Sequence, residues 1–304
     1  MKKILITGSS GLVGTALVQA FRASGFVVVG LDLRGLGEEY GDVLDEQRVR
    51  AAMHGVDLVI HCAAISRVIT GEQERWLCFN TNVKGTFNVF EVARVLHVPV
   101  LYLSSREVYG NPSRLPVTED FPIQPINTYG MTKQIGENLV KSLLMEGCRV
   151  AIVRLSNVYG SVYDYEDRVV PAFVRAAILG RPLRVDGPEH TFDFTHVDDV
   201  VTGIMAIAEL LMSDAPVPPT IHLLTGRPTT LQQLAELAIH TTRSNSPIIH
   251  AEPRNYDVAK FYGDPALAKA VLGWRAQISI EEGVKRLIND FRRPVNQLRK
   301  VGAP

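Results

Sequence analysis

The chain has 304 residues, of which 46% are hydrophobic, and its 32 basic side chains balance 32 acidic ones. This length can bury a large core, and we expect two lobes, while the balanced charge offers no field that would attract nucleic acid or an anionic membrane. No apolar run approaches the roughly 20 residues that cross a bilayer, and the three cysteines lack paired or metal-like spacing, which suits a reducing cytoplasm and predicts no metal site.

Up to about residue 155, short apolar runs alternate with amphipathic stretches. The apolar runs predict strands at KILIT, FVVVGLD, VDLVIHC, VPVLYLSS and RVAIVRL. The stretches between them predict helices at about 12–23, 72–96 and 129–145. Runs that are apolar on both faces and separated by helices are typical of a parallel sheet covered on both sides. Residues 1–155 therefore predict an α/β fold with a Rossmann-type, doubly wound parallel sheet.

Residues 156–304 have a more mixed pattern. Helix-like segments near 171–179, 197–211, 231–241 and 280–291 are separated by turns rich in proline and glycine. We expect a smaller, mixed α/β lobe here, with some segments returning to the first domain. The final residues, RRPVNQLRKVGAP, predict a basic tail.

The first predicted turn carries Gly8, Gly11 and Gly14 between a strand and a helix. Gly8 permits a tight turn, Gly11 lets the backbone approach a pyrophosphate, and Gly14 lets helix and strand pack closely. The next strand ends in Asp32, about 20 residues on, where a carboxylate accepts hydrogen bonds from an adenosine ribose. The pattern predicts a dinucleotide site and favours NAD over NADP, because this carboxylate repels a 2′-phosphate. Arg34 could reverse that preference.

Other residues extend the predicted dinucleotide site. Asp42 can reach the adenine, although a solvated turn aspartate fits nearly as well. Ala63 and Ala64 end a strand where small side chains leave room for the dinucleotide, and His61 before them is expected to be a packed core residue. The neighbouring residues that we assign to the same site are Ser10, Leu12, Val13, Leu33, Val43 and Ser104.

Tyr129 and Lys133 are four residues apart and share one face of a predicted helix. A nearby ammonium favours the phenolate and lowers a tyrosine pKa from near ~10, so that Tyr129 can take or return a proton. Lys133 can also hold the nicotinamide ribose. Such a pair alone is usually a solvated helix face, but here it follows a dinucleotide pattern and a strand that ends in serines.

With these motifs the sequence resembles the extended short-chain dehydrogenase/reductase family, in its NAD-dependent nucleotide-sugar epimerase, dehydratase and decarboxylase branch, which includes UDP-glucose 4-epimerases. The resemblance covers nearly the whole chain and rests on TGSSGLVG, HCAA, NVKGTFNVFEVA, SSREVYG, YGMTK, RLSNVYG, DFTHVDDVV and LGW. It implies NAD as cofactor and a nucleotide-diphosphate sugar, with UDP favoured, as substrate. It also implies a homodimer built from the long helices of the first lobe, and sugar-nucleotide recognition by the second lobe.

The resemblance also assigns roles to single residues. Ser105 matches the catalytic serine or threonine, which hydrogen-bonds the sugar oxygen that becomes a carbonyl and works with Tyr129 and Lys133. Asn82 matches an asparagine near the cofactor. The residues assigned to the substrate are Ser66, Arg106, Asn157, Arg184 and Arg254.

One motif departs from the family. Members usually read Arg-Asp-Phe where this chain has Phe192, Asp193 and Phe194, so an arginine expected near the diphosphate is absent. Arg184 or His190 could compensate, and each fits an exposed loop residue equally well. The departure leaves the nucleotide and the sugar open, but not the hydride chemistry.

In the family scheme the sugar passes through a 4-keto intermediate. The resemblance favours C4 epimerisation with recycled NAD, because epimerisation requires the fewest residues besides Ser105, Tyr129 and Lys133. Dehydratases use an Asp-Glu pair after the catalytic threonine. Here the first position is Arg106, which cannot donate a proton near neutral pH because its pKa exceeds ~12.

Glu107 leaves alternatives open. It matches a catalytic glutamate of the uronate decarboxylases, and Arg106 could bind a uronate carboxylate bidentately. The two side chains could equally brace their loop. Net reduction, and a non-catalytic relative that only binds NAD, are the remaining alternatives.

Overall fold

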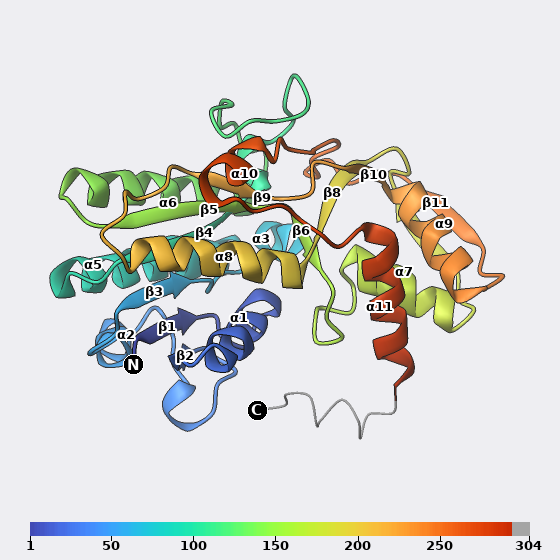
Figure 1. Cartoon of the computed structure of the whole chain (residues 1–304). Helices are drawn as coiled ribbons and strands as arrows, with labels where there is room; N and C mark the ends of the chain where they lie inside the picture. Colours follow the sequence, from blue (N-terminus) through green and yellow to red (C-terminus); the bar gives the residue numbers. More distant parts are fainter. Residues whose placement is uncertain (294–304) are drawn as a thin grey trace.

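The computed structural model describes residues 1–293, so residues 294–304, with most of the predicted basic tail, lie outside it. Its centre is a six-stranded parallel sheet with the order β2-β1-β3-β4-β5-β9 (Figure 1). Every residue of β3, β4 and β5 is buried, as expected for strands covered on both faces. The predicted Rossmann-type sheet is confirmed. The strands are β1 (Lys3–Thr7), β2 (Val27–Leu31), β3 (Leu58–His61), β4 (Val100–Ser105), β5 (Val150–Leu155) and β9 (Ile221–Leu223).

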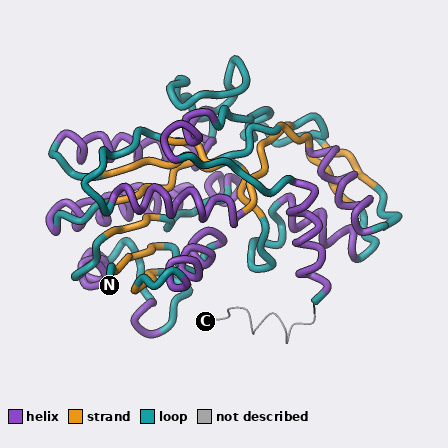
Figure 2. Tube along the Cα trace, in the orientation of Figure 1, coloured by secondary structure: helices purple, strands orange, loops and turns teal. Residues whose placement is uncertain are grey.

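Helices pack on both faces of this sheet (Figure 2). Alternate residues of β4 face opposite ways, so that Leu101 and Leu103 join one apolar core while Val100 and Tyr102 join the other. The first core contains α1 (Leu12–Ala23), α8 (Val197–Leu211) and α10 (Ala266–Leu272). The second contains α2 (Glu46–Met53), α5 (Thr86–Leu96) and α6 (Thr128–Met145).

Three elements that follow residue 155, namely β9, α8 and α10, belong to these first layers. Strand β9 pairs with β5 at the edge of the sheet. Helix α8 packs beside α1 and contributes Val200, Ile204 and Ile207 to the same core as β1 and β3. The boundary at residue 155 therefore separates sequence segments but not the layers of the fold.

The rest of the chain after residue 155 forms the second lobe around its own apolar core. It holds a three-stranded sheet, β10-β8-β6, and a two-stranded sheet, β11-β7. Its strands are β6 (Asn157–Tyr159), β7 (Leu183–Asp186), β8 (Thr191–His196), β10 (Pro228–Thr230) and β11 (Ile248–Ala251). Its helices are α7 (Val169–Ile178), α9 (Leu231–Thr242) and α11 (Ile280–Arg292).

The single long helix predicted at 72–96 is wrong. The chain forms α3 (Val68–Gln73), α4 (Arg75–Phe79), a wider π-helical stretch at Asn80–Gly85 and then α5. Glu74 separates the first two helices with φ −120° and ψ 58°, and the buried side chain of Asn82 bonds the backbone of Ile65 instead of facing outward. Short helical turns also form at Gly37–Glu39 and Arg106–Tyr109. None of the helices within residues 1–293 is long and apolar enough to span a membrane.

Two buried histidines are held as neutral rings. His61 on β3 lies between two hydroxyls, with Nδ1 2.7 Å from Oγ1 of Thr7 and Nε2 2.9 Å from Oγ1 of Thr86. His222 on β9 has Nε2 2.6 Å from the hydroxyl of Tyr109. Burial lowers the pKa of each ring to about 3. His61 is therefore a packed core residue, as predicted.

We expect the free energy of unfolding to fall as the pH drops from about 6.5 toward about 3, because the unfolded chain binds protons that the buried rings exclude. Between these pKa values each ring adds up to about 1.4 kcal/mol per pH unit to the slope. Urea unfolding at about pH 7 and about pH 5 measures this slope. It should be shallower in His61→Gln and unchanged in the control His54→Gln, which alters an exposed histidine. A wild-type slope in His61→Gln would contradict the assignment.

Candidate active site

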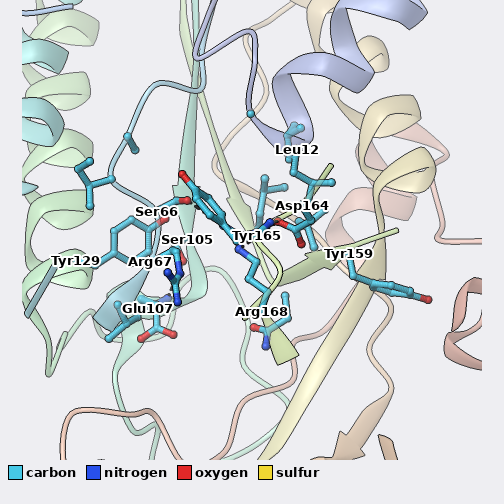
Figure 3. Close-up of a pocket in the computed structure, with 18 of the residues that line it drawn as sticks. Leu12, Ser66, Arg67, Ser105, Glu107, Tyr129, Tyr159, Asp164, Tyr165 and Arg168 are labelled. Atoms are coloured by element: carbon cyan, nitrogen blue, oxygen red, sulfur yellow. Dashed lines mark hydrogen bonds and ion pairs between the residues drawn. The ribbon is translucent and has the colours of Figure 1, made fainter. Parts of the chain in front are cut away.

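A cavity of about 1000 Å³ lies at the carboxyl ends of the central strands and reaches into the second lobe (Figure 3). The chain runs from β1 to β2 on one side and continues with β3 on the other, and α/β folds leave a crevice at such a switch point. The cavity lies at the upper end of the size range for small-molecule and cofactor sites.

The glycine-rich turn after β1 forms a cradle that larger side chains would fill. Gly8 has φ +70°, and a Cβ there would lie 2.7 Å from the backbone nitrogen of Ala63. A Cβ on Gly11 would lie 3.2 Å from the carbonyl oxygen of Gly8, and one on Gly14 would clash with the same oxygen. No side chain caps the N-terminus of α1, so its first N–H groups can meet a pyrophosphate. The cradle fits a dinucleotide.

Asp32 is held in place at the end of β2. Its two carboxylate oxygens accept hydrogen bonds from the backbone N–H groups of Ser10 (3.0 Å) and Arg34 (2.8 Å). The guanidinium of Arg34 turns back to donate to the Ser10 carbonyl (2.7 Å) and lies 3.6 Å from Asp32. Arg34 is thus paired within the turn, and the carboxylate remains available for ribose hydroxyls, which fits NAD.

Most of the residues that the sequence assigned to the site line the cavity. The cofactor candidates among them are Gly8, Gly11, Leu12, Val13, Gly14, Asp32, Leu33, Arg34, Asp42, Val43, Ala63, Ala64 and Ser104. The catalytic and substrate candidates among them are Ser66, Ser105, Arg106, Glu107, Tyr129, Lys133, Asn157, Arg184 and Arg254.

Ser10 and Asn82 do not line the cavity. Ser10 acts through its backbone, by its bond to Asp32. The amide of Asn82 is buried and bonds both backbone groups of Ile65 (2.7 and 3.1 Å) and the hydroxyl of Thr132 (2.9 Å). It therefore fixes the segment that follows Ala64 from behind.

Ser105, Tyr129 and Lys133 meet at one end of the cavity. Ser105 is the last residue of β4, and Tyr129 and Lys133 lie on successive turns of α6. Helix α6 begins at Thr128 because the side chain of Asn127 caps it by accepting from the N–H of Gly130 (2.8 Å). Lys133 donates to the carbonyl of Leu103 (2.7 Å). The strand end and the helix start thus fix the three side chains relative to one another.

The expected effect of Lys133 on Tyr129 is wrong for the protein alone. Burial raises the pKa of Tyr129 to about 12, although the neighbouring Ser105 hydroxyl and the charge of Arg168 act in the opposite direction. Burial also lowers the pKa of Lys133 to about 8. Loss of hydration affects the pKa of Tyr129 more than the charge of Arg168 does. The Lys133 ammonium is directed at the Leu103 carbonyl.

Arg106 and Glu107 form a buried ion pair beside Ser105. Arg106 Nη2 lies 2.7 Å from Oε1 of Glu107, and the two side chains are 9% and 7% exposed. Oε2 of Glu107 accepts from the Asn127 amide (2.7 Å), and Nε of Arg106 donates to Oδ1 of Asn157 (2.8 Å). The pair therefore connects β4 to the start of α6 and to β6.

One segment of the second lobe, residues 161–168, was not predicted to belong to the site. Its residues 163–168 line the cavity near the end that holds Ser105 and Tyr129, which we call the reacting end (Figure 3). Arg168 donates to the hydroxyl of Ser66 (2.9 Å), and Arg67 pairs with Asp167. Both guanidinium groups lie over the ring of Tyr165, at 5.4 Å for Arg67 and 5.6 Å for Arg168. The sequence SVYDYEDR directly after a strand carried a signal, because segments at strand ends build sites in such folds.

Arginines of the second lobe line the far wall of the cavity. Arg184 on β7 donates to Asp186 (2.8 Å), and Arg254 donates to Asp257 (2.8 Å). Both side chains are partly exposed, so they can meet an anionic group that enters the cavity. Within residues 1–293 no group of three or more His, Cys, Asp or Glu side chains could hold a metal ion.

Comparisons with known proteins agree with this geometry. A putative UDP-glucose 4-epimerase of Methanocaldococcus jannaschii is 29% identical over 303 residues, which cover 94% of this chain and 97% of that protein. UDP-glucuronic acid decarboxylase 1 of Xenopus tropicalis is 28% identical over 310 residues, which cover 96% of this chain and 72% of that protein. The structure of MoeE5 in complex with UDP-glucuronic acid and NAD is 27% identical, with a TM-score of 0.89 over 96% of this chain and 99% of that one.

A family model carries the assignment. The model of the NAD dependent epimerase/dehydratase family matches residues 4–216, a stretch that includes the glycine-rich turn, Ser105, Tyr129 and Lys133. The family resemblance of the sequence is thereby confirmed, and the chain belongs to the NAD-dependent epimerase/dehydratase family.

Proposed function

We propose that this enzyme is a nucleotide-sugar epimerase that inverts C4 of a UDP-sugar through a transient 4-keto intermediate, with NAD retained and recycled. The observation that carries the proposal is the meeting of Ser105, Tyr129 and Lys133 in one cavity with the glycine cradle. Its similarity to a putative UDP-glucose 4-epimerase supports the proposal.

The chain's own residues have distinct tasks in this reaction. When bound in the cradle, NAD supplies a hydride acceptor and donor. Ser105 hydrogen-bonds the sugar oxygen, and Tyr129 removes and returns the proton of the C4 hydroxyl. Arg168 places positive charge near the phenol, and bound ligands would have to strengthen this effect, because burial raises the pKa of Tyr129 to about 12.

Dehydration receives little support from the residues beside Ser105. A dehydratase needs a proton donor where this chain has Arg106, and a guanidinium does not donate its proton near neutral pH. Both oxygens of Glu107 are engaged within the protein, one by Arg106 and one by Asn127. Glu107 therefore suits a positioning role better than an acid role.

Decarboxylation of a UDP-uronate is the second candidate. It is favoured by the position of Glu107, two residues after Ser105, and by the similarity to UDP-glucuronic acid decarboxylase 1. Epimerisation remains our first choice because it requires only proton transfer, hydride transfer and room for the keto sugar to turn.

We also propose a cytoplasmic homodimer. The cytoplasmic location is supported by three free cysteines, Cys62, Cys78 and Cys148. The dimer is supported by large apolar side chains exposed on neighbouring helices: Trp76, Phe79, Phe87 and Met131 are 78%, 42%, 49% and 47% exposed. Phe90 on α5 is 2% exposed and packs inward. A second copy of the chain would cover the outward residues by its own α4, α5 and α6.

The reaction itself can be tested by product analysis. Purified protein without added cofactor is incubated with UDP-glucose, UDP-galactose and UDP-glucuronate, and the sugars are followed by NMR. We expect C4 epimers and no net change in bound NAD. Release of carbon dioxide would favour the decarboxylase, and the absence of any product from all three sugars would reject the proposal.

Tyr129→Phe tests the proton transfer. We expect turnover to fall by about 10²- to 10⁴-fold, because general acid–base catalysis typically contributes that much. NAD released on denaturation should stay at the wild-type amount. The control is Tyr262→Phe, a change outside the cavity that should leave turnover unaltered. Wild-type turnover in Tyr129→Phe would contradict the assigned role.

Phe87→Glu tests the dimer. A buried charge at the interface should convert the protein into a monomer, as measured by sedimentation velocity. The matched control is Leu179→Glu, which places the same charge on an apolar residue of the second lobe that is 60% exposed. A monomeric wild type, or a dimeric Phe87→Glu, would contradict the proposed interface.

A further inference from the structure

The guanidinium of Arg106 has one nitrogen that the protein leaves without a partner. Its Nε donates to Asn157 (2.8 Å), and its Nη2 lies 2.7 Å from Glu107. Its Nη1 is buried and has no hydrogen-bond partner among residues 1–293. A buried, unpaired N–H of a charged group is costly, so such a group calls for an acceptor that is not part of the described chain.

The acceptor side chains around Arg106 already accept other hydrogen bonds. Both oxygens of Glu107 accept, one from Arg106 and one from Asn127, and Oδ1 of Asn157 accepts from Arg106 Nε. The next acid in the neighbouring strand, Asp193, is bonded to Thr225 and Gly226. An acceptor for Nη1 can enter through the cavity, which Arg106 lines together with Ser105 and Tyr129.

The aromatic residues around Arg106 fix the position of its charge. The centre of the guanidinium lies 4.6 Å from the ring of Phe192 and 5.7 Å from the ring of Phe261. The charge is thus held next to the end of β4, which Arg106 directly follows. It is therefore adjacent in sequence to Ser105, at the reacting end, whereas Arg184 and Arg254 line the second-lobe wall.

We propose that Arg106 Nη1 binds a carboxylate on the sugar, so that the substrate of the proposed epimerase is a UDP-hexuronate. A guanidinium offers only donors and a carboxylate only acceptors, and their charges are opposite. A sugar hydroxyl would satisfy the same N–H without the charge, and an oxygen of the diphosphate would satisfy it with the charge but from the other end of the ligand. This inference rests on the proposed function for its reaction, but not for the binding contact.

The contact also favours retention of the carboxylate. Loss of carbon dioxide from a 4-keto uronate breaks the C5–C6 bond and moves its electron pair onto C5 and the C4 carbonyl. The negative charge thus leaves the carboxylate in that step. Because Arg106 binds that charge where it starts, it stabilises the uronate more than the transition state that loses carbon dioxide.

Binding measurements test the carboxylate contact without relying on turnover. In NAD-loaded protein carrying Tyr129→Phe, calorimetry compares UDP-glucuronate, UDP-glucose and UDP, with and without Arg106→Gln. We expect Arg106→Gln to weaken UDP-glucuronate by about 10- to 100-fold, the range for a charge-assisted hydrogen bond. The loss for UDP-glucose and UDP should be at least tenfold smaller. Arg181→Gln, on an exposed arginine outside the cavity, is the matched control.

Each other outcome overturns the inference. Equal losses for all three ligands would assign Arg106 to the diphosphate, and no loss for any would make it a structural brace. If Arg106→Gln does not fold, Arg106→Lys replaces it in the same measurements. The ligand preference of the Tyr129→Phe protein with Arg106 intact is a second test. Tighter binding of UDP-glucose than of UDP-glucuronate by that protein would contradict the inference. Turnover of UDP-glucose but not of UDP-glucuronate would reject the inference alone, whereas binding without any turnover would reject the proposed reaction alone.

Discussion

A buried chain of hydrogen bonds holds the reacting end of the site together. It runs from Asn127, which caps α6, through Glu107 and Arg106 to Asn157 on β6. The two outer links join the turn that holds Arg106 and Glu107 to the start of α6 and to β6, so the strand that ends in Ser105, the helix that carries Tyr129 and the first strand of the second lobe are fixed to one another. Removing one partner of such a buried pair leaves an uncompensated charge, and the geometry of the site depends on the whole chain.

The environment of the catalytic groups is dominated by burial. In the protein alone, burial moves the pKa of Tyr129 up and that of Lys133 down, which keeps each closer to its neutral form. The charge of Arg168 acts against burial on Tyr129 without overcoming it.

The sequence predicted the central sheet and most of its helices, and nearly all of the site residues that it named line the cavity, because these depend on local patterns. Glycines in a turn, a carboxylate after β2 and a tyrosine and lysine one helical turn apart carry their geometry with them. The failures were non-local. The helix predicted at 72–96 is broken at Glu74, which no local pattern marks, and the pKa of Tyr129 depends on how deeply the side chain is buried.

The segment at 161–168 shows the same limit. Its aromatic and charged residues are ordinary for a loop, and only the fold brings Arg168 to Ser66 and Arg67 to Asp167. Likewise, the sequence suggested two roles for Arg106, as a brace or as a ligand. Nε and Nη2 of Arg106 contact Asn157 and Glu107, as a brace would. Nη1 has no hydrogen-bond partner among residues 1–293.

The crossing of the chain between the lobes limits how the molecule can open. After β6 the chain returns to the first layers for α8 and β9, leaves again for β10, α9 and β11, and returns once more for α10 before α11. A wide rotation of one lobe would have to bend all of these connections at once and expose the apolar side of β4 and β5 that α8 covers. Ligands should therefore enter and leave by small displacements of surface segments, and a fragment that ends at residue 155 would not keep a covered sheet.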